Sequence, residues 1–147
     1  MALKSTARVV SVSAVIVCGL FVAAPAGAQL APATSLGTVS LPQAVKANGQ
    51  DLAAGSYTLR LSNDAVPKVV GQAPDSAQWV EFVRGGKVAG KELATKVSSA
   101  DVKSIAEMTP PAAGSSKVQM LKGADYVRVW INRAGTHYLV HLAAVPK

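Results

Sequence analysis

Cysteine is almost absent from this chain of 147 residues, and its absence excludes several kinds of chemistry. The single cysteine, Cys18, lies in an apolar segment near the N-terminus that we expect to be removed after export. The remaining chain then has no disulfide, no thiol nucleophile and no thiolate metal ligand. Its stability must come from a hydrophobic core, and a chain of this length can bury well over half of its unfolded surface.

Recognisable catalytic motifs are missing as well. The chain has no Gly-x-Ser-x-Gly sequence, the sharp turn that exposes the nucleophile of α/β-hydrolases. Its eight acidic residues mostly fall at turns or on alternating polar positions, whereas glycoside hydrolysis requires a carboxylate pair. Asp75, Asp101 and Asp125 lack the spacing of a calcium loop. Neither Gly85-Gly86 nor Gly123 precedes a helix, as in a phosphate cradle. We therefore expect neither an enzyme nor a cofactor.

The two histidines do not predict a metal site. His137 and His141 are four residues apart, and four residues of a strand span about 13 Å. A metal ion needs its ligand nitrogens about 2 Å away. The two rings cannot share one ion, so we expect no metal.

Basic residues exceed acidic ones but are scattered. The chain carries 15 Lys and Arg against 8 Asp and Glu; removal of residues 1–28 takes away Lys4 and Arg8, leaving 13 against 8 and a formal charge of +5. This mild bias indicates a soluble basic surface and leaves attraction to an anionic envelope component open. Nucleic acid is not an expected partner, because no basic run is interleaved with aromatics.

The N-terminus has the three parts of a secretory signal. Met1–Arg8 is basic, Val9–Ala24 is apolar and uncharged, and Ala26 and Ala28 place small side chains at the two positions that a signal peptidase accepts. We expect a signal peptide over residues 1–28, cleavage after Ala28 and a periplasmic or extracellular protein.

Two other interpretations of this segment are weaker. An uncleaved anchor requires roughly 20 apolar residues, but this run is shorter and ends in Pro and Gly. A lipoprotein signal at Cys18 requires a small residue before the cysteine, where Val17 stands. We expect no stable membrane anchor after processing.

The exported part reads as a flexible leader over residues 29–35 followed by one all-β domain over residues 36–147. Alternation of apolar and polar residues between turn signals predicts about seven antiparallel strands. The segments are Leu36–Leu41, Ser56–Ser62, Ala77–Arg84, Lys87–Val97, Lys117–Leu121, Tyr126–Asn132 and Thr136–Ala143. Ala47–Asp51 is predicted as a turn, and Asn63–Ser76 as a loop. Such a pattern is typical of a β-sandwich or a small barrel.

One short helix is expected at most. Ser98–Met108 is the candidate, because Ser98 or Ser99 can cap it and Val102, Ile105 and Ala106 fall on one face.

The register of the final hairpin decides which side chains share a face. A turn of two or four residues places one apolar set on a single face: Val127, Val129, Ile131, Tyr138, Val140 and Leu142. A three-residue loop with Gly135 as a bulge is also compatible with the sequence and would set Arg128 beside Val140. We prefer the first register, because only it gives a clean apolar face.

The opposite face of this hairpin holds the candidate ligand-binding residues. They are Tyr126, Arg128, Trp130, His137 and His141. Aromatic rings with a polar edge beside a guanidinium can stack on a sugar or hold an anionic ligand. The alternative is that this face packs under a loop, the helix or a second sheet, since Trp and Tyr are mostly buried where they can be.

A ten-residue stretch, Leu52–Leu61, resembles a segment of prealbumin-like and carboxypeptidase-regulatory-like β-sandwich domains, in which a small-residue turn feeds a strand with an inward Tyr. The chain as a whole resembles small exported bacterial proteins of unknown function. These resemblances imply an extracytoplasmic β-sandwich that binds or scaffolds, and they transfer no active site.

We therefore expect a non-enzymatic accessory or binding protein of the cell envelope. An anionic envelope component, a carbohydrate and another protein are all open as partners. A small serine-dependent hydrolase that uses one histidine and a self-assembling structural surface protein are the alternatives.

Overall fold

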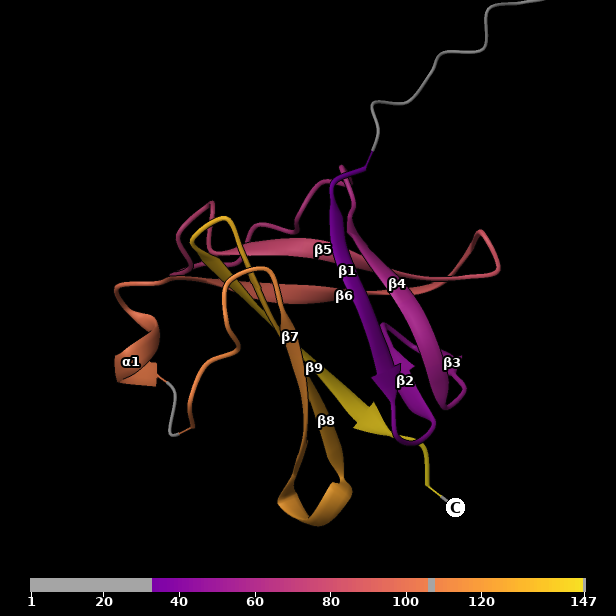
Figure 1. Cartoon of the computed structure of the whole chain (residues 1–147). Coiled ribbons are helices and arrows are strands. Elements are labelled where there is room, and N and C mark those ends of the chain that lie inside the picture. The colour runs from indigo at the N-terminus through magenta and orange to yellow at the C-terminus, as the bar shows by residue number, and fades with distance from the viewer. Residues whose placement is uncertain (1–32, 106–107, 147) are drawn as a thin grey trace, which may run out of the picture.

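The computed structural model describes residues 33–105 and 108–146, which form one antiparallel sheet and one four-residue α-helix (Figure 1). The predicted all-β class is confirmed. The strands are β1 Ser35–Leu41, β2 Val45–Ala47, β3 Gln50–Leu52, β4 Gly55–Leu61, β5 Ala77–Arg84, β6 Lys87–Ser98, β7 Ser116–Leu121, β8 Tyr126–Arg133 and β9 Thr136–Ala144. The expected signal peptide, residues 1–28, lies outside the described residues.

The sheet curves so strongly that its two ends meet. Hydrogen bonding runs through β1-β4-β5-β6-β9, and β9 pairs along its other edge with β8, which pairs with β7. In Figure 1, β5 and β6 cross behind β1 and β4, while β7 and β8 lie in front. Strand β1 therefore lies beside β7, and the Ser116 hydroxyl donates to the Thr38 carbonyl at 3.4 Å. The opposite walls enclose one core, so the molecule combines the sandwich and barrel geometries that the sequence leaves open.

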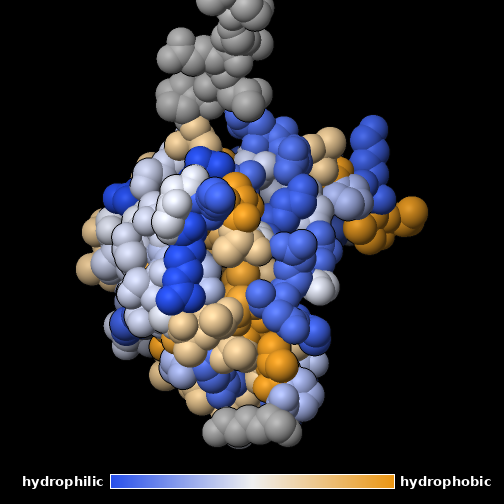
Figure 2. Space-filling view, turned by 90° about the vertical axis from the view of Figure 1, so that its right-hand side faces the viewer, coloured by the Kyte–Doolittle hydropathy of each residue, from blue (hydrophilic) through white to orange (hydrophobic). Residues whose placement is uncertain are grey.

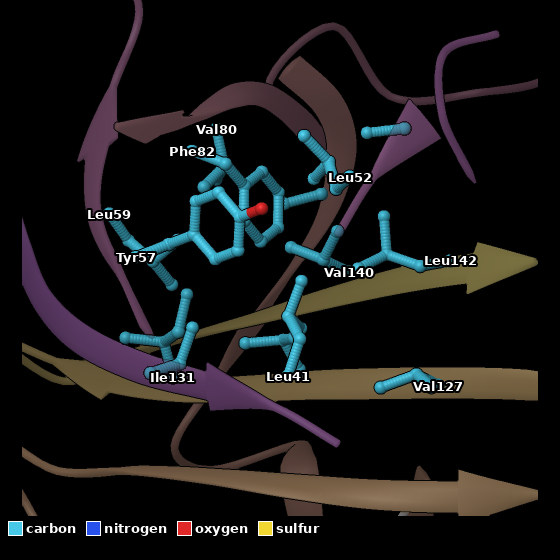
Figure 3. Packing of buried hydrophobic residues seen from close by; sticks show 14 of the residues in the cluster. Leu41, Leu52, Tyr57, Leu59, Val80, Phe82, Val127, Ile131, Val140 and Leu142 are labelled. Atoms are coloured by element: carbon cyan, nitrogen blue, oxygen red, sulfur yellow. The ribbon is translucent and has the colours of Figure 1, made fainter. Parts of the chain in front are cut away.

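The core follows from the alternation of side chains along the strands, which β4 shows most clearly. In β4, Tyr57 and Leu59 are buried, whereas Ser56 and Thr58 face water. The ring of Tyr57 meets that of Phe82 edge to face, with centroids 6.1 Å apart (Figure 3). The Tyr57 hydroxyl donates to the Ala53 carbonyl at 2.8 Å. Its polar edge is thereby satisfied while the ring fills the centre of the core.

Two short strands, β2 and β3, raise the count above the predicted seven. The segment Ala47–Asp51 was expected to be a turn, and its centre is one: Asn48 and Gly49 have φ values of 44° and 83°, as a two-residue hairpin requires. Three residues on each side extend this turn into a hairpin. Gly90 on β6 lets the hairpin approach, because a Cβ at Gly90 would lie 3.0 Å from Leu52 Cδ2.

The predicted helix over Ser98–Met108 is too long. The helix α1 spans Val102–Ile105 only, because Ser98 still pairs with Thr136 at the end of β6. Ala106 lies outside the described residues. Of the two apolar residues that remain, Val102 is buried but Ile105 is 59% exposed. Figure 1 places α1 beyond the end of β6, on the outside of the sheet.

The side of the molecule near β3 and β4 has a mixed surface. Hydrophilic and apolar residues are interspersed there, with a narrow apolar band down the middle of the face and a separate apolar cluster at its right-hand edge (Figure 2). Among the described residues, no helix has the length and apolar character that crossing a membrane requires.

Candidate functional site

The β8–β9 hairpin has the register that the sequence favoured. Ala134 and Gly135 form a two-residue turn with φ values of 50° and 76°, and Arg133 pairs directly with Thr136. The pairs Val127–Leu142, Val129–Val140 and Ile131–Tyr138 face the core. The five candidate residues consequently share the outer face of the hairpin.

These five residues lie at very different depths. Trp130 is 0% exposed and His137 is 2% exposed, whereas Tyr126 is 41% exposed. Arg128 is half-buried and His141 is exposed. The face is therefore dry near the Ala134-Gly135 turn and wet at the other end of the hairpin.

A second, smaller core buries Trp130. Its members are Val97 from β6, Val102 from α1, Trp130 and Leu139. The connection between α1 and β7 also contributes, since the Asn132 side chain donates to the Pro111 carbonyl at 2.9 Å. Trp130 and His137 thus pack under the helix and a loop and are not presented to a ligand at the surface.

A chain of hydrogen bonds fixes the protonation state of His137. The Trp130 indole N–H donates to His137 Nδ1 at 2.9 Å, so Nδ1 carries no proton. The Ser99 hydroxyl donates to the Gly135 carbonyl at 2.9 Å, which leaves its oxygen to accept from His137 Nε2 at 3.3 Å. Burial lowers the pKa of His137 and favours this neutral ring. To act as a base for Ser99, the histidine must direct an unprotonated nitrogen towards the hydroxyl. In this tautomer, His137 directs its protonated Nε2 towards Ser99 instead.

Arg128 and His141 form the polar part of the wetter end. Arg128 Nε donates to His141 Nε2 at 3.0 Å, which requires a neutral imidazole. Desolvation and, less strongly, the Arg128 charge lower the pKa of His141. Among the described residues, no carboxylate lies within ion-pair distance of Arg128. Arg128 is therefore a cation whose charge is not neutralised by a described neighbour.

Two hollows flank the Arg128–His141 pair, and together with the pair we call them the outer groove. The first hollow, of about 140 Å³, is lined by Thr95, Val97, Val102, Ile105, Arg128, Trp130, Leu139 and His141. The second, of about 470 Å³, is lined by Leu121, Lys122, Tyr126 and His141. The Lys122 ammonium lies 5.5 Å from the centre of the Tyr126 ring. The groove thus joins apolar walls to cationic side chains.

A larger hollow of about 740 Å³ lies under the loop between β4 and β5. Its lining mixes the carboxylates of Asp64 and Asp75 with the ammonium groups of Lys68 and Lys96. Small-molecule sites are lined mainly by apolar side chains with a few placed polar groups. The outer groove has this character and the larger hollow does not.

No cluster of metal ligands occurs in the described ranges 33–105 and 108–146, where no three His, Cys, Asp or Glu side chains come together. His137 and His141 bond to different partners, Trp130 and Arg128.

Sequence reasoning missed the part of the groove that comes from other strands. Thr95 and Val97 are opposite Leu139 and His137 across the β6–β9 ladder, and no local pattern pairs these two strands. Ile105 was predicted to share one helix face with Val102, and it stands exposed at the rim of the first hollow. Lys122 directly follows β7, and no local pattern relates it to the outer face of the hairpin.

Comparisons of the chain with protein-family models, with curated proteins and with solved structures give no match. The resemblance of Leu52–Leu61 to prealbumin-like domains stays a prediction.

Replacing Trp130 with alanine should cost far more folding stability than replacing Arg128 with alanine. We expect W130A to lose about 3–5 kcal/mol of stability, because a large buried ring leaves a cavity. We expect R128A to stay within about 1 kcal/mol of the wild type, as substitutions at accessible positions usually do. Urea denaturation measures both free energies of unfolding. A small loss of stability for W130A would contradict the burial of Trp130 in the second core.

His137 should make stability depend on pH just below neutrality. Burial lowers its folded pKa below the ordinary value of 6.5, so below about pH 6.5 the unfolded chain binds a proton that the folded chain does not. The free energy of unfolding therefore decreases as the pH falls from about 7 through the folded pKa. We expect H137Q, whose amide oxygen can accept from Trp130, to lose less stability over this interval.

Urea denaturation of H137Q between about pH 7.5 and pH 5 tests this, above the range where carboxylates titrate. The matched variant H141Q removes the other histidine with a lowered pKa, so the double variant should show the flattest profile. If the free energies of unfolding of H137Q and of the wild type change in parallel with pH, His137 is not the source of the pH dependence.

Proposed function

We propose that this chain is an exported, non-enzymatic binding protein of the cell envelope that holds its ligand in the outer groove. The observation that carries the proposal is the combination, in one depression, of a compact apolar hollow with Arg128, whose charge has no described carboxylate partner. Apolar walls supply binding energy, and a few placed polar groups orient the ligand.

Export is supported by the order of the N-terminal segments. A basic start, an apolar run over Val9–Ala24 and small residues at Ala26 and Ala28 precede the first strand, which begins at Ser35. The core formed by the described residues consists of aliphatic and aromatic side chains.

The two alternative functions have less support. For a serine hydrolase, the serine must face an unprotonated histidine nitrogen. Among the described residues, Ser99 is the serine hydrogen-bonded to a histidine, and its hydroxyl oxygen accepts a hydrogen bond from the N–H of His137. For self-assembly through strand edges, a long free edge is needed. The edges of β1 and β7 lie beside each other, and β3 has only three residues.

Processing tests the export part of the proposal. When the full chain is expressed in a bacterial host, we expect mass spectrometry of the accumulated protein to give an N-terminus at Gln29. Replacing Ala28 with Phe should block cleavage, because the peptidase pocket accepts only small side chains. A protein that keeps Met1 in the wild type would overturn export by this route.

Benzyl alcohol, a neutral probe of suitable size, tests the groove. Titrated into the ¹⁵N-labelled processed protein, it should shift the NMR signals of Thr95, Ile105, Leu139 and the Trp130 indole N–H, which belong to the first hollow. The variant I105D places a charge at the apolar rim and should weaken binding. V88D places the same charge at an exposed valine that does not line the first hollow, and it should leave binding unchanged. Shifts spread evenly over the protein, or none in the groove, would remove the proposal.

A further inference from the structure

The first hollow of the outer groove sets the size of the apolar group that fits. At about 140 Å³, it is close to the cavity of roughly 150 Å³ that accepts one benzene molecule in another protein. The buried side chains of Val97, Trp130 and Leu139 form its inner wall, and Ile105 stands at the rim. One phenyl or branched alkyl group fills such a space, whereas a long acyl chain does not fit within it.

Arg128 sets the charge of the group beside it. Its Nε is held by His141 at 3.0 Å, and neither Nη nitrogen has a hydrogen-bond partner in the described part of the chain. A guanidinium in this state presents further donors to an incoming acceptor, in the planar arrangement that matches a carboxylate. No Asp or Glu of the described residues lines either hollow of the groove, and Lys122 adds a second positive charge along it.

The spacing between these two features limits the ligand further. Arg128 itself lines the hollow that Trp130 and Leu139 wall. The anionic group and the apolar group must therefore be near neighbours in one molecule, separated by only a few bonds. The second hollow, walled by Leu121 and Tyr126, continues past His141 and offers room for whatever is attached to them.

We infer that the outer groove binds a carboxylate that carries a compact apolar group, such as a phenyl or isobutyl group, within a few bonds. This inference rests on the proposed function, because it assigns a ligand class to the same groove. The apolar group fills the first hollow, and Arg128 pairs with the carboxylate. The same chemistry occurs in a free aryl or branched-chain acid and in the C-terminal residue of a peptide.

A comparison of phenylacetate with its neutral isostere phenylacetamide separates the contribution of the carboxylate charge to binding from the contribution of the ligand's shape. In NMR titrations of the processed protein, we expect both probes to shift the signals of the first hollow and phenylacetate to bind about tenfold more tightly or better, because charge-assisted hydrogen bonds are the stronger ones. Acetate, which lacks the apolar group, should bind far more weakly than phenylacetate.

The variant R128Q should abolish the preference for the acid while leaving weak binding of the amide. K87Q removes one positive charge from the exposed first residue of β6 and should keep the preference intact. Equal binding of acid and amide by the wild type, or an unchanged preference in R128Q, would overturn the ligand class and leave the groove as a site. If neither phenylacetamide nor benzyl alcohol binds, the proposed function fails too.

A third probe identifies the source of the carboxylate. The tripeptide Ala-Ala-Phe with a free C-terminus is compared with its C-terminal amide and with phenylacetate. Tighter binding of the free tripeptide, through added contacts near Leu121 and Tyr126, supports a peptide C-terminus as the ligand. Binding of phenylacetate but not of the tripeptide supports a small free acid.

Discussion

The two-residue turn at Ala134 and Gly135 is the constraint on which the rest of the structure depends. Because side chains alternate with a period of two, a shift of one residue between β8 and β9 would exchange their faces relative to each other. The observed register places three valine or isoleucine side chains of β8 against Tyr138, Val140 and Leu142 in the main core. It simultaneously places Trp130, Arg128 and both histidines on the outside. One turn therefore determines both the interior packing and the existence of the groove.

The cover over the outer face explains why its two ends differ. Strand β9 pairs with β6 from Thr136 to Val140 and with the short β2 only at its far end. The chain leaves β6 at Ser98 and forms α1 a few residues later, so the helix covers the end of β9 near the turn. Trp130 and His137 lie beneath this cover and become core. Arg128 and His141 lie at its border, where the surroundings are partly dry and a charge interacts more strongly than it would in open water.

The strands were predictable because each alternates cleanly and is bounded by turn residues; Ala77–Arg84 was predicted with its exact limits. Strands β2 and β3 were missed because three residues are too few for a periodic pattern, although the Asn48-Gly49 turn between them was recognised. The outer face of the hairpin was also predictable, since register and alternation fix it. Its coverage was not, because alternation says which face a residue takes and nothing about what lies over that face. Two of the residues that pack against Trp130, Val97 and Val102, lie about thirty residues before it in the chain.

The two histidines of β9 lie on the same face and have different structural roles. His137 is enclosed and neutral, and it satisfies the Trp130 indole and the Ser99 hydroxyl, so that no polar group of this small core is left without a partner. His141 is also neutral above its lowered pKa, and it accepts a hydrogen bond that orients Arg128. Neither imidazole supplies charge to the groove near neutral pH. The positive charge there rests on Arg128 and Lys122, which line the two hollows of the groove. Under the proposed function, Arg128 and Lys122 recognise the anionic group of the ligand, and the histidines contribute geometry instead of charge.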